Sequence, residues 1–210
     1  MLFHGQGVDA ARPADAGPPK SADNCAYSRD ELLCAESEVS VMGDSRGISV
    51  GEDAPQFSAP LVRPDGSDDD VALEELLSDS AVLLCFYTND FSPDCVSEWC
   101  EFRDFGWFSA NDDVRVVGVS KSRVRTHHEF IKRLDLNFPL YSDTDLDIAA
   151  AYGVRYRAFR LFPRARRSCF LIDTDGVVRY KWISEHPLDP SRDTPPVAEI
   201  HRTVERELDV

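Results

Sequence analysis

The chain has 210 residues, of which 42% are hydrophobic and 10% aromatic. This size and composition suit one packed domain with a tail; they exclude wholesale disorder and are short for two full domains. A net charge of −15 argues against a nucleic-acid partner, because phosphate would be repelled. No run approaches the roughly 18 apolar residues of a membrane span, and residues 1–20 lack the features of a secretory leader. We therefore expect a cytoplasmic protein without a membrane partner.

The charge has an unusual make-up, with 25 Asp and 13 Glu against 19 Arg and only 4 Lys. A strongly acidic, Lys-poor surface binds hydrated cations, and salt screens its self-repulsion. We interpret this as a halophilic surface, adapted to a salt-filled cytoplasm. The alternative, a basic partner that docks on acidic patches, is less favoured because the acidic excess is spread along the whole chain.

Residues 1–47 differ from the rest of the chain. They are rich in Gly, Pro and small polar residues, and show no sustained strand or helix period apart from a short helical pattern near residues 29–35. We expect a disordered N-terminal arm, followed by a folded domain over 48–210. Because Met42 is the one methionine after Met1, a second hypothesis places the true start of the chain there.

From residue 48 onward, apolar runs alternate with helical patterns. The predicted elements, in chain order, are a strand over 57–62, a turn over 64–66, a segment of open type over 71–77, a buried strand over 81–87, a helix over 93–107, a buried strand over 114–120, a helix over 126–134, a helix over 145–152 ended by Gly153, a hairpin of strands over 169–173 and 177–183, and a helix over 195–208. This order predicts an α/β sandwich.

The chain has six cysteines, at positions 25, 34, 85, 95, 100 and 169. No pair has the Cys-x-x-Cys spacing of a redox motif or a zinc knuckle, and a cytosolic chain is not expected to carry a disulfide framework. Cys85 and Cys169 lie within apolar strands, which favours buried packing roles. The two in the arm are assigned no role, and no metal site is expected.

Cys95 lies in the first turn of the predicted helix, after Ser92 as N-cap and Pro93 at the first helical position. The free backbone N–H groups and the helix dipole at that end favour a thiolate. Cys100 follows five residues later, which places the two Cα atoms about 8–9 Å apart on an intact helix. A disulfide needs less than about 7 Å, so the pair could bond only if the helix unwound locally. From the residues alone, two cysteines on one helix are more often packing residues, and that interpretation is favoured at this point.

The segment from Phe86 to Asp104 resembles the active-site segment of the peroxiredoxins, and is most similar to the bacterioferritin-comigratory (Q-type) subgroup. The matching residues are Phe86, Tyr87, Ser92, Pro93, Cys95, Glu98, Cys100, Phe102, Arg103 and Asp104. Further similarity lies at 51–57, 138–143, 151–154 and 167–173, so the resemblance runs in order from about residue 48 to 207.

The resemblance implies a thioredoxin-like fold, with a central mixed β-sheet flanked by helices, and reduction of hydrogen peroxide and organic hydroperoxides. Cys95 would be the peroxidatic cysteine and Cys100 the resolving cysteine, with Ser92 and Arg167 at the reacting atoms and Glu98 in support. A thioredoxin- or glutaredoxin-like protein would reduce the intramolecular disulfide. No cofactor or metal is implied, and we expect a monomer or weak homodimer.

One position departs from the family pattern: Thr88 stands where the family has a proline that shields the thiolate. Two alternatives to the peroxidase therefore stay open. One is a thioredoxin-fold thiol–disulfide oxidoreductase, against which the lack of Cys-x-x-Cys argues; the other is a catalytically decayed thioredoxin-fold binding module.

An arginine-rich segment and a pair of adjacent histidines also bear on function. Residues 155–167 hold six arginines and three aromatics, which predicts a surface near the active site, a docking site for an acidic electron donor, or a solvated loop. His127 and His128 are adjacent and so do not share a helix face, which favours two surface histidines over a metal pair.

Overall fold

The computed structural model describes residues 46–158, 161–186 and 193–208. The strands are β1 (Ser58–Val62), β2 (Asp68–Ala72), β3 (Ala81–Phe86), β4 (Val114–Ser120), β5 (Leu140–Ser142), β6 (Arg155–Ala158), β7 (Phe162–Ala165), β8 (Ser168–Ile172) and β9 (Val178–Ile183). The helices are α1 (Leu73–Leu77), α2 (Pro93–Phe105), α3 (Trp107–Ala110), α4 (Val124–Leu134), α5 (Asp147–Ala151) and α6 (Val197–Leu208). Residues 1–45 of the predicted arm lie outside the described residues, and with them Met42, the helix predicted near 29–35, Cys25 and Cys34.

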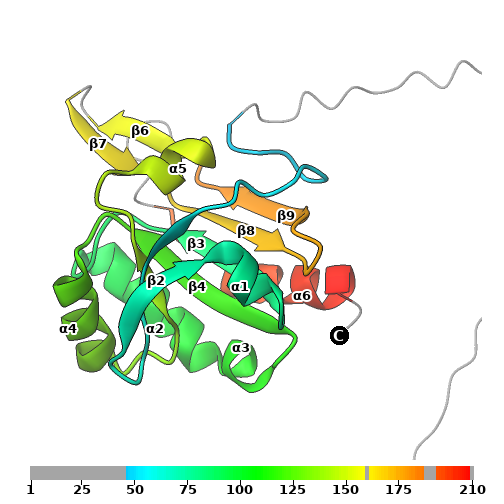
Figure 1. Ribbon diagram of the computed structural model, residues 1–210, viewed down its shortest axis with the longest axis horizontal. Helices are drawn as coiled ribbons and strands as arrows, with labels where there is room; N and C mark the ends of the chain where they lie inside the picture. Colours follow the sequence, from blue (N-terminus) through cyan, green and yellow to red (C-terminus); the bar gives the residue numbers. More distant parts are fainter. Residues whose placement is uncertain (1–45, 159–160, 187–192, 209–210) are drawn as a thin grey trace, which may run out of the picture. The chain divides into compact units, whose positions relative to one another are not determined.

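Seven strands form one mixed sheet, in the order β2-β1-β5-β4-β3-β8-β9 (Figure 1). The central strands β3, β4 and β5 are parallel, whereas β8 and β9 continue the sheet antiparallel on one side and β1 and β2 on the other. The uninterrupted apolar runs of β3 and β4 are typical of strands that are covered on both faces. The predicted central mixed sheet flanked by helices is confirmed.

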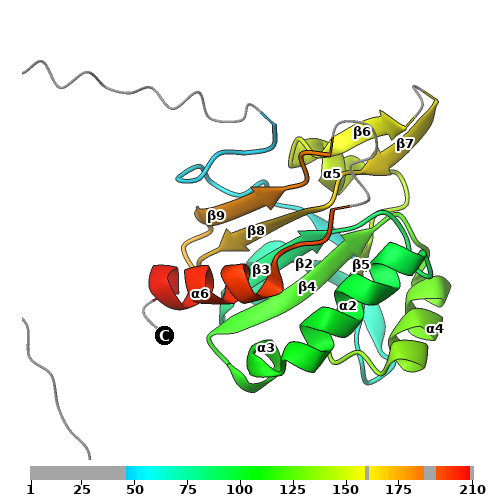
Figure 2. The same ribbon diagram turned by 180° about the vertical axis from the view of Figure 1, so that it is seen from behind.

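Alternate residues of β3 divide the core into two layers. Val82 and Leu84 point into a cluster with α1 and α5, while Leu83 and Cys85 point into a cluster with α2, α3, α4 and α6. The second layer is seen from behind in Figure 2. A side chain at Gly118 on β4 would meet Leu140 and Trp99 at 2.5 Å, so only glycine lets α2 pack this closely on the sheet.

Most predicted elements are confirmed, and the differences have local causes. The open segment over 71–77 contains the end of β2 and all of α1. The helix predicted to end at 107 ends at Phe105, because Gly106 adopts a left-handed φ of 72° and α3 begins after it. The short strand β5 and the hairpin of β6 and β7 were not predicted. In β6, exposed arginines alternate with half-buried Tyr156 and Ala158, a strand period that the arginines conceal.

Candidate active site

The turn from β3 into α2 places Cys95 in the core. Ser92 has an extended backbone (φ −71°, ψ 140°), and its hydroxyl accepts the backbone N–H of Cys95 at 3.4 Å, as expected of an N-cap. Pro93 occupies the first helical position. The Cys95 side chain is fully buried at the end of the sheet where β3 terminates. The predicted N-cap and helix start are therefore confirmed.

Arg167 reaches this cysteine from the segment that joins β7 to β8. Its Nη2 atom lies 3.2 Å from Sγ of Cys95, and its Nη1 atom donates to the Glu98 carboxylate and, at 3.3 Å, to the carbonyl of Asp94. The side chains of Arg167 and Glu98 are both fully buried. Register pairing of Phe86 with Ser168 brings the start of β8 beside the end of β3, which explains how residues 72 apart in sequence meet.

The pKa values of the two acidic groups reflect their burial. Burial raises the pKa of the Cys95 thiol, and the Glu98 carboxylate raises it further. Arg167, Ser92 and the Asn89 backbone act in the opposite direction, but the pKa stays above its ordinary value. Burial also raises the pKa of Glu98 to about 7, against the lowering effect of Arg167.

One buried arginine therefore serves two acidic groups. If Cys95 and Glu98 were both ionised, two negative charges would face the one charge of Arg167, so the two groups titrate as a coupled set. The sequence-based argument named the helix terminus and, through the resemblance, Arg167, but it did not include the opposing effects of burial and Glu98. The helix end favours the thiolate, but burial and Glu98 oppose it, and the thiolate depends on Arg167.

The loop between β3 and α2 carries two local irregularities. Thr88, which stands where the family pattern has proline, is 3% exposed, and its hydroxyl has no hydrogen-bond partner among the described residues. Phe91 has a left-handed φ of 58°, which is unfavourable for a bulky side chain. Its ring packs edge-on against Phe130 of α4, with centroids 5.1 Å apart.

A second buried polar cluster holds the same loop to α4. The Asp90 carboxylate lies 3.0 Å from Nδ1 of His127 and accepts the Tyr87 hydroxyl at 2.7 Å. The Nε2 atom of His127 lies 3.2 Å from the carbonyl of Tyr141, and the backbone N–H of Asp90 donates to Ser122. This network ties the loop after β3 to α4 and β5.

The prediction that His127 is a surface histidine is therefore wrong, because its side chain is fully buried. His128, by contrast, is partly exposed beside Asp68. The available signal was the spacing of His127 from Phe130, which places both on the apolar face of the helix.

The other cysteines occupy different environments. Cys100 lies on the same unbroken helix as Cys95 and is partly exposed. Cys85 and Cys169 are register partners on β3 and β8, and both are buried, as predicted. Burial raises the pKa of Cys169 well above its ordinary value.

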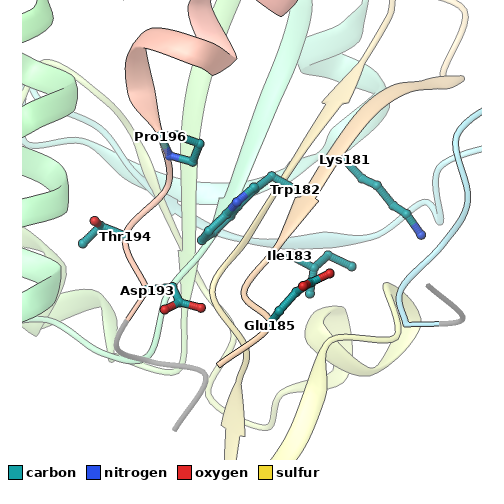
Figure 3. A pocket seen from close by; sticks show the side chains of 7 residues that line it. All are labelled: Lys181, Trp182, Ile183, Glu185, Asp193, Thr194 and Pro196. Atoms are coloured by element: carbon teal, nitrogen blue, oxygen red, sulfur yellow. The ribbon is translucent and has the colours of Figure 1, made fainter. Parts of the chain in front are cut away.

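The described residues contain no cluster of three or more His, Cys, Asp or Glu side chains placed to hold a metal ion. Within the same part of the chain, no helix has the length and apolar character to cross a membrane. A pocket of about 760 Å³ lies elsewhere, between β9 and the segment before α6. Figure 3 shows Trp182 and Lys181 pointing to opposite sides of β9 there, and no residue of the Cys95 site lines it.

Comparisons with known proteins agree with this geometry. The model of the AhpC/TSA family matches residues 50–181. A Bcp peroxiredoxin of Coxiella burnetii is 34% identical over 138 residues, which is 64% of this chain and 88% of that protein. Among solved structures, peroxidoxin BcpB of Mycobacterium tuberculosis has a TM-score of 0.62 and 28% identity, over 78% of this chain and 98% of its own. The reduced 2-Cys peroxiredoxin of Plasmodium vivax has a TM-score of 0.65 and 26% identity, over 75% and 81%. The thioredoxin-like fold is thereby confirmed.

Proposed function

The chain belongs to the AhpC/TSA family and is a thiol-dependent peroxidase, and on that premise we propose that Cys95 is its peroxidatic cysteine. The observation that carries this assignment is the 3.2 Å approach of Arg167 to Sγ of Cys95 in a fully buried site at a helix N-terminus. Among the four described cysteines, only Cys95 combines a cationic neighbour with an N-cap. The oxidoreductase and binding-module alternatives are not favoured.

The first step oxidises Cys95. Its thiolate attacks one oxygen of the hydroperoxide, the O–O bond breaks, and the second oxygen leaves as an alcohol or water after it takes a proton. Sulfur becomes a sulfenic acid. Arg167 stabilises the thiolate and the charge that grows on the leaving oxygen, and Ser92 lies close enough to Cys95 to hydrogen-bond the peroxide. Glu98 orients Arg167 and is a positioning residue.

The second step forms a disulfide between Cys95 and Cys100. The Cys100 thiolate attacks the sulfenic sulfur, an S–S bond forms, the S–O bond breaks, and the hydroxide leaves as water after it takes a proton. Because both cysteines lie on the continuous helix α2, its first turns must unwind before the sulfur atoms can meet. The adjoining loop must then give up part of its contacts with α4, so the Asp90–His127 pair opposes this step.

A protein dithiol of the thioredoxin or glutaredoxin type then reduces the disulfide by thiol–disulfide exchange. The proposed cycle uses no metal and no bound cofactor. We also propose a cytoplasmic location, a monomer or weak homodimer, and adaptation to high salt; the net charge of −15 supports the last of these. Activity is therefore best measured in high-potassium buffer.

Disulfide mapping tests the assignment of Cys100. Reduced protein is treated with one equivalent of hydrogen peroxide, alkylated and digested, and a Cys95–Cys100 linkage is expected. A Cys100→Ser variant should still consume the first equivalent of peroxide but lose thioredoxin-dependent turnover. A linkage of Cys95 to Cys85 or Cys169, or full turnover of Cys100→Ser, would overturn the resolving role of Cys100.

A further inference from the structure

The hairpin of β6 and β7 stands apart from the seven-stranded sheet as a two-stranded ribbon, beside the start of β8 (Figures 1 and 2). Residues 155–167, which include it, hold six arginines and no acidic residue, in a chain whose net charge is −15. Leu161 and Phe162, at the turn of the hairpin, are 72% and 58% exposed. A basic surface with an apolar tip is typical of a docking site and not of a packed element.

Strand register assigns these side chains to faces. Arg155 pairs with Ala165 and Arg157 with Pro163, and residues that pair directly lie on one face of a ribbon. Both arginines are exposed, and the side chains beside them are small or short. The opposite face carries Tyr156, over whose ring Arg166 stacks at 5.5 Å. Phe162 pairs with Ala158 on the Tyr156 face and is exposed near the turn, whereas Ala165 beside Arg155 is buried. The base of the hairpin is thus packed, and farther out it presents Arg155 and Arg157 on one face and Phe162 on the other.

The hairpin is also tied to the reacting cysteine. Arg167, which contacts Cys95, lies two residues after the end of β7, and the backbone of Arg166 closes the hairpin base by donating to Val154. Four-residue strands reach about 13 Å from that base. A protein that binds the hairpin is therefore held within reach of Cys95 once α2 unwinds.

We propose that the exposed part of this hairpin, formed by Arg155 and Arg157 on one face and by the Leu161–Phe162 tip, docks the protein dithiol that reduces the Cys95–Cys100 disulfide, and that this partner presents an acidic surface with an apolar patch. This inference rests on the proposed function. Charge complementarity favours an acidic partner, because the hairpin's arginines would repel a basic one. Nucleic acid would also suit cationic groups, but the acidic remainder of the chain would repel an extended polyanion.

Charge reversal tests the proposal. The double variant Arg155→Glu/Arg157→Glu is compared with Arg202→Glu/Arg206→Glu on α6, which packs on the far end of α2 through Phe105 and His201. Each variant changes the net charge from −15 to −19. Peroxide turnover is measured with an acidic thioredoxin and, separately, with dithiothreitol. The hairpin variant should raise KM for thioredoxin on the order of 10-fold, and Arg155→Gln/Arg157→Gln should raise it less.

Turnover with dithiothreitol, the rate of the first peroxide oxidation and the α6 variant should all stay within twofold of the wild type. Equal effects of the two reversals on KM, or an equal loss with dithiothreitol, would overturn the docking role. Salt-sensitive binding of a fluorescent oligonucleotide that the hairpin variant alone loses, with KM for thioredoxin unchanged, would overturn it in favour of nucleic acid. If wild-type protein is oxidised rapidly by peroxide and is then reduced by dithiothreitol but not by thioredoxin, that result would refute both the proposed reductant and the docking role.

Discussion

The described residues contain two pairs of cysteines that are alike in composition and opposite in setting. Cys85 and Cys169 sit directly across from each other on antiparallel strands, already close together and fully buried. Cys95 and Cys100 lie on one helix, too far apart to bond while it is intact. If closeness decided redox chemistry, the sheet pair would be the reactive one.

The difference lies in the groups around each sulfur. Cys95 lies in the first turn of α2, and the Arg167 guanidinium is 3.2 Å from its Sγ atom. The Sγ atom of Cys85 donates to the Leu83 carbonyl at 3.8 Å, and its other polar neighbour is the Cys169 thiol, which supplies no positive charge. Cys85 and Cys169 also lie in strands that are paired on both sides within the sheet, whereas Cys95 lies next to a loop with a left-handed Phe91. A reactive thiol needs a counter-charge and room to move more than it needs a second thiol nearby.

The largest expected effect separates the two pairs outright. Cys95→Ser should lower the second-order rate of peroxide consumption by more than about 10³-fold, because the nucleophile is lost. Cys85→Ala, which removes one sulfur from the sheet pair, should leave that rate within twofold. Stopped-flow peroxide consumption with reduced protein measures both. A comparable loss of rate in Cys85→Ala, with circular dichroism unchanged, would contradict the claim that the sheet pair takes no part in peroxide reduction.

Removing the counter-charge should come next in size. Arg167→Gln is expected to lower the rate of Cys95 oxidation about 10²–10³-fold, since both the thiolate and the leaving oxygen lose their cation. Leaving Glu98 buried without a partner also destabilises the fold by roughly 3–5 kcal/mol. Arg167→Lys keeps the charge and separates the two effects. Partial recovery of rate by Lys is expected, and no recovery in a folded Lys variant would argue against a charge effect.

Glu98→Gln tests whether Glu98 and Cys95 compete for the positive charge of Arg167. Glutamine can still accept from Arg167 but carries no charge, so the pKa of Cys95 should fall and the pH–rate profile should move to lower pH. Ultraviolet titration of the thiolate in a Cys100→Ser background measures this. An unchanged or raised midpoint would contradict the competition for Arg167.

The same substitution has a consequence for stability. The folded-state pKa of Glu98, about 7, exceeds the ordinary value of 4.5, so the folded protein holds this proton more tightly than the unfolded chain does. The free energy of unfolding of the wild type, relative to Glu98→Gln, should therefore fall by about 3 kcal/mol as pH rises from 4.5 to 7. Denaturant unfolding at several pH values measures this difference. A difference in the free energy of unfolding that does not change with pH would contradict the raised pKa of buried Glu98.

The smallest effect concerns Thr88. Because its hydroxyl is buried without a partner, Thr88→Val should raise the free energy of unfolding by about 1 kcal/mol. Peroxide turnover should change by less than twofold, since the hydroxyl contacts none of the reacting groups in the structure. A loss of activity without a loss of stability would instead assign Thr88 a place at the peroxide.

The sequence predicted those parts of the site that depend on local order. Ser92 and Pro93 are helix-start residues by type, and they place Cys95 at the helix end whatever the rest of the chain does. Arg167 was found through family resemblance alone, since nothing local joins residues 72 positions apart. Helix spacing could have shown that His127 is buried, but its pairing with Asp90 depends on α4 lying against the loop, a tertiary contact without a local pattern. The β6–β7 hairpin was missed because its arginines hide the strand period.

The most direct test of the claim that Cys95 is the peroxide-reactive cysteine among the four described is a trapping experiment. Reduced Cys100→Ser protein in high-potassium buffer receives one equivalent of hydrogen peroxide and a dimedone-type reagent, and the modified peptide is identified by mass spectrometry. We expect a sulfenic acid adduct on Cys95, with Cys85 and Cys169 unmodified. An adduct on Cys85 or Cys169, or an unreacted Cys95 after the peroxide is consumed, would contradict it.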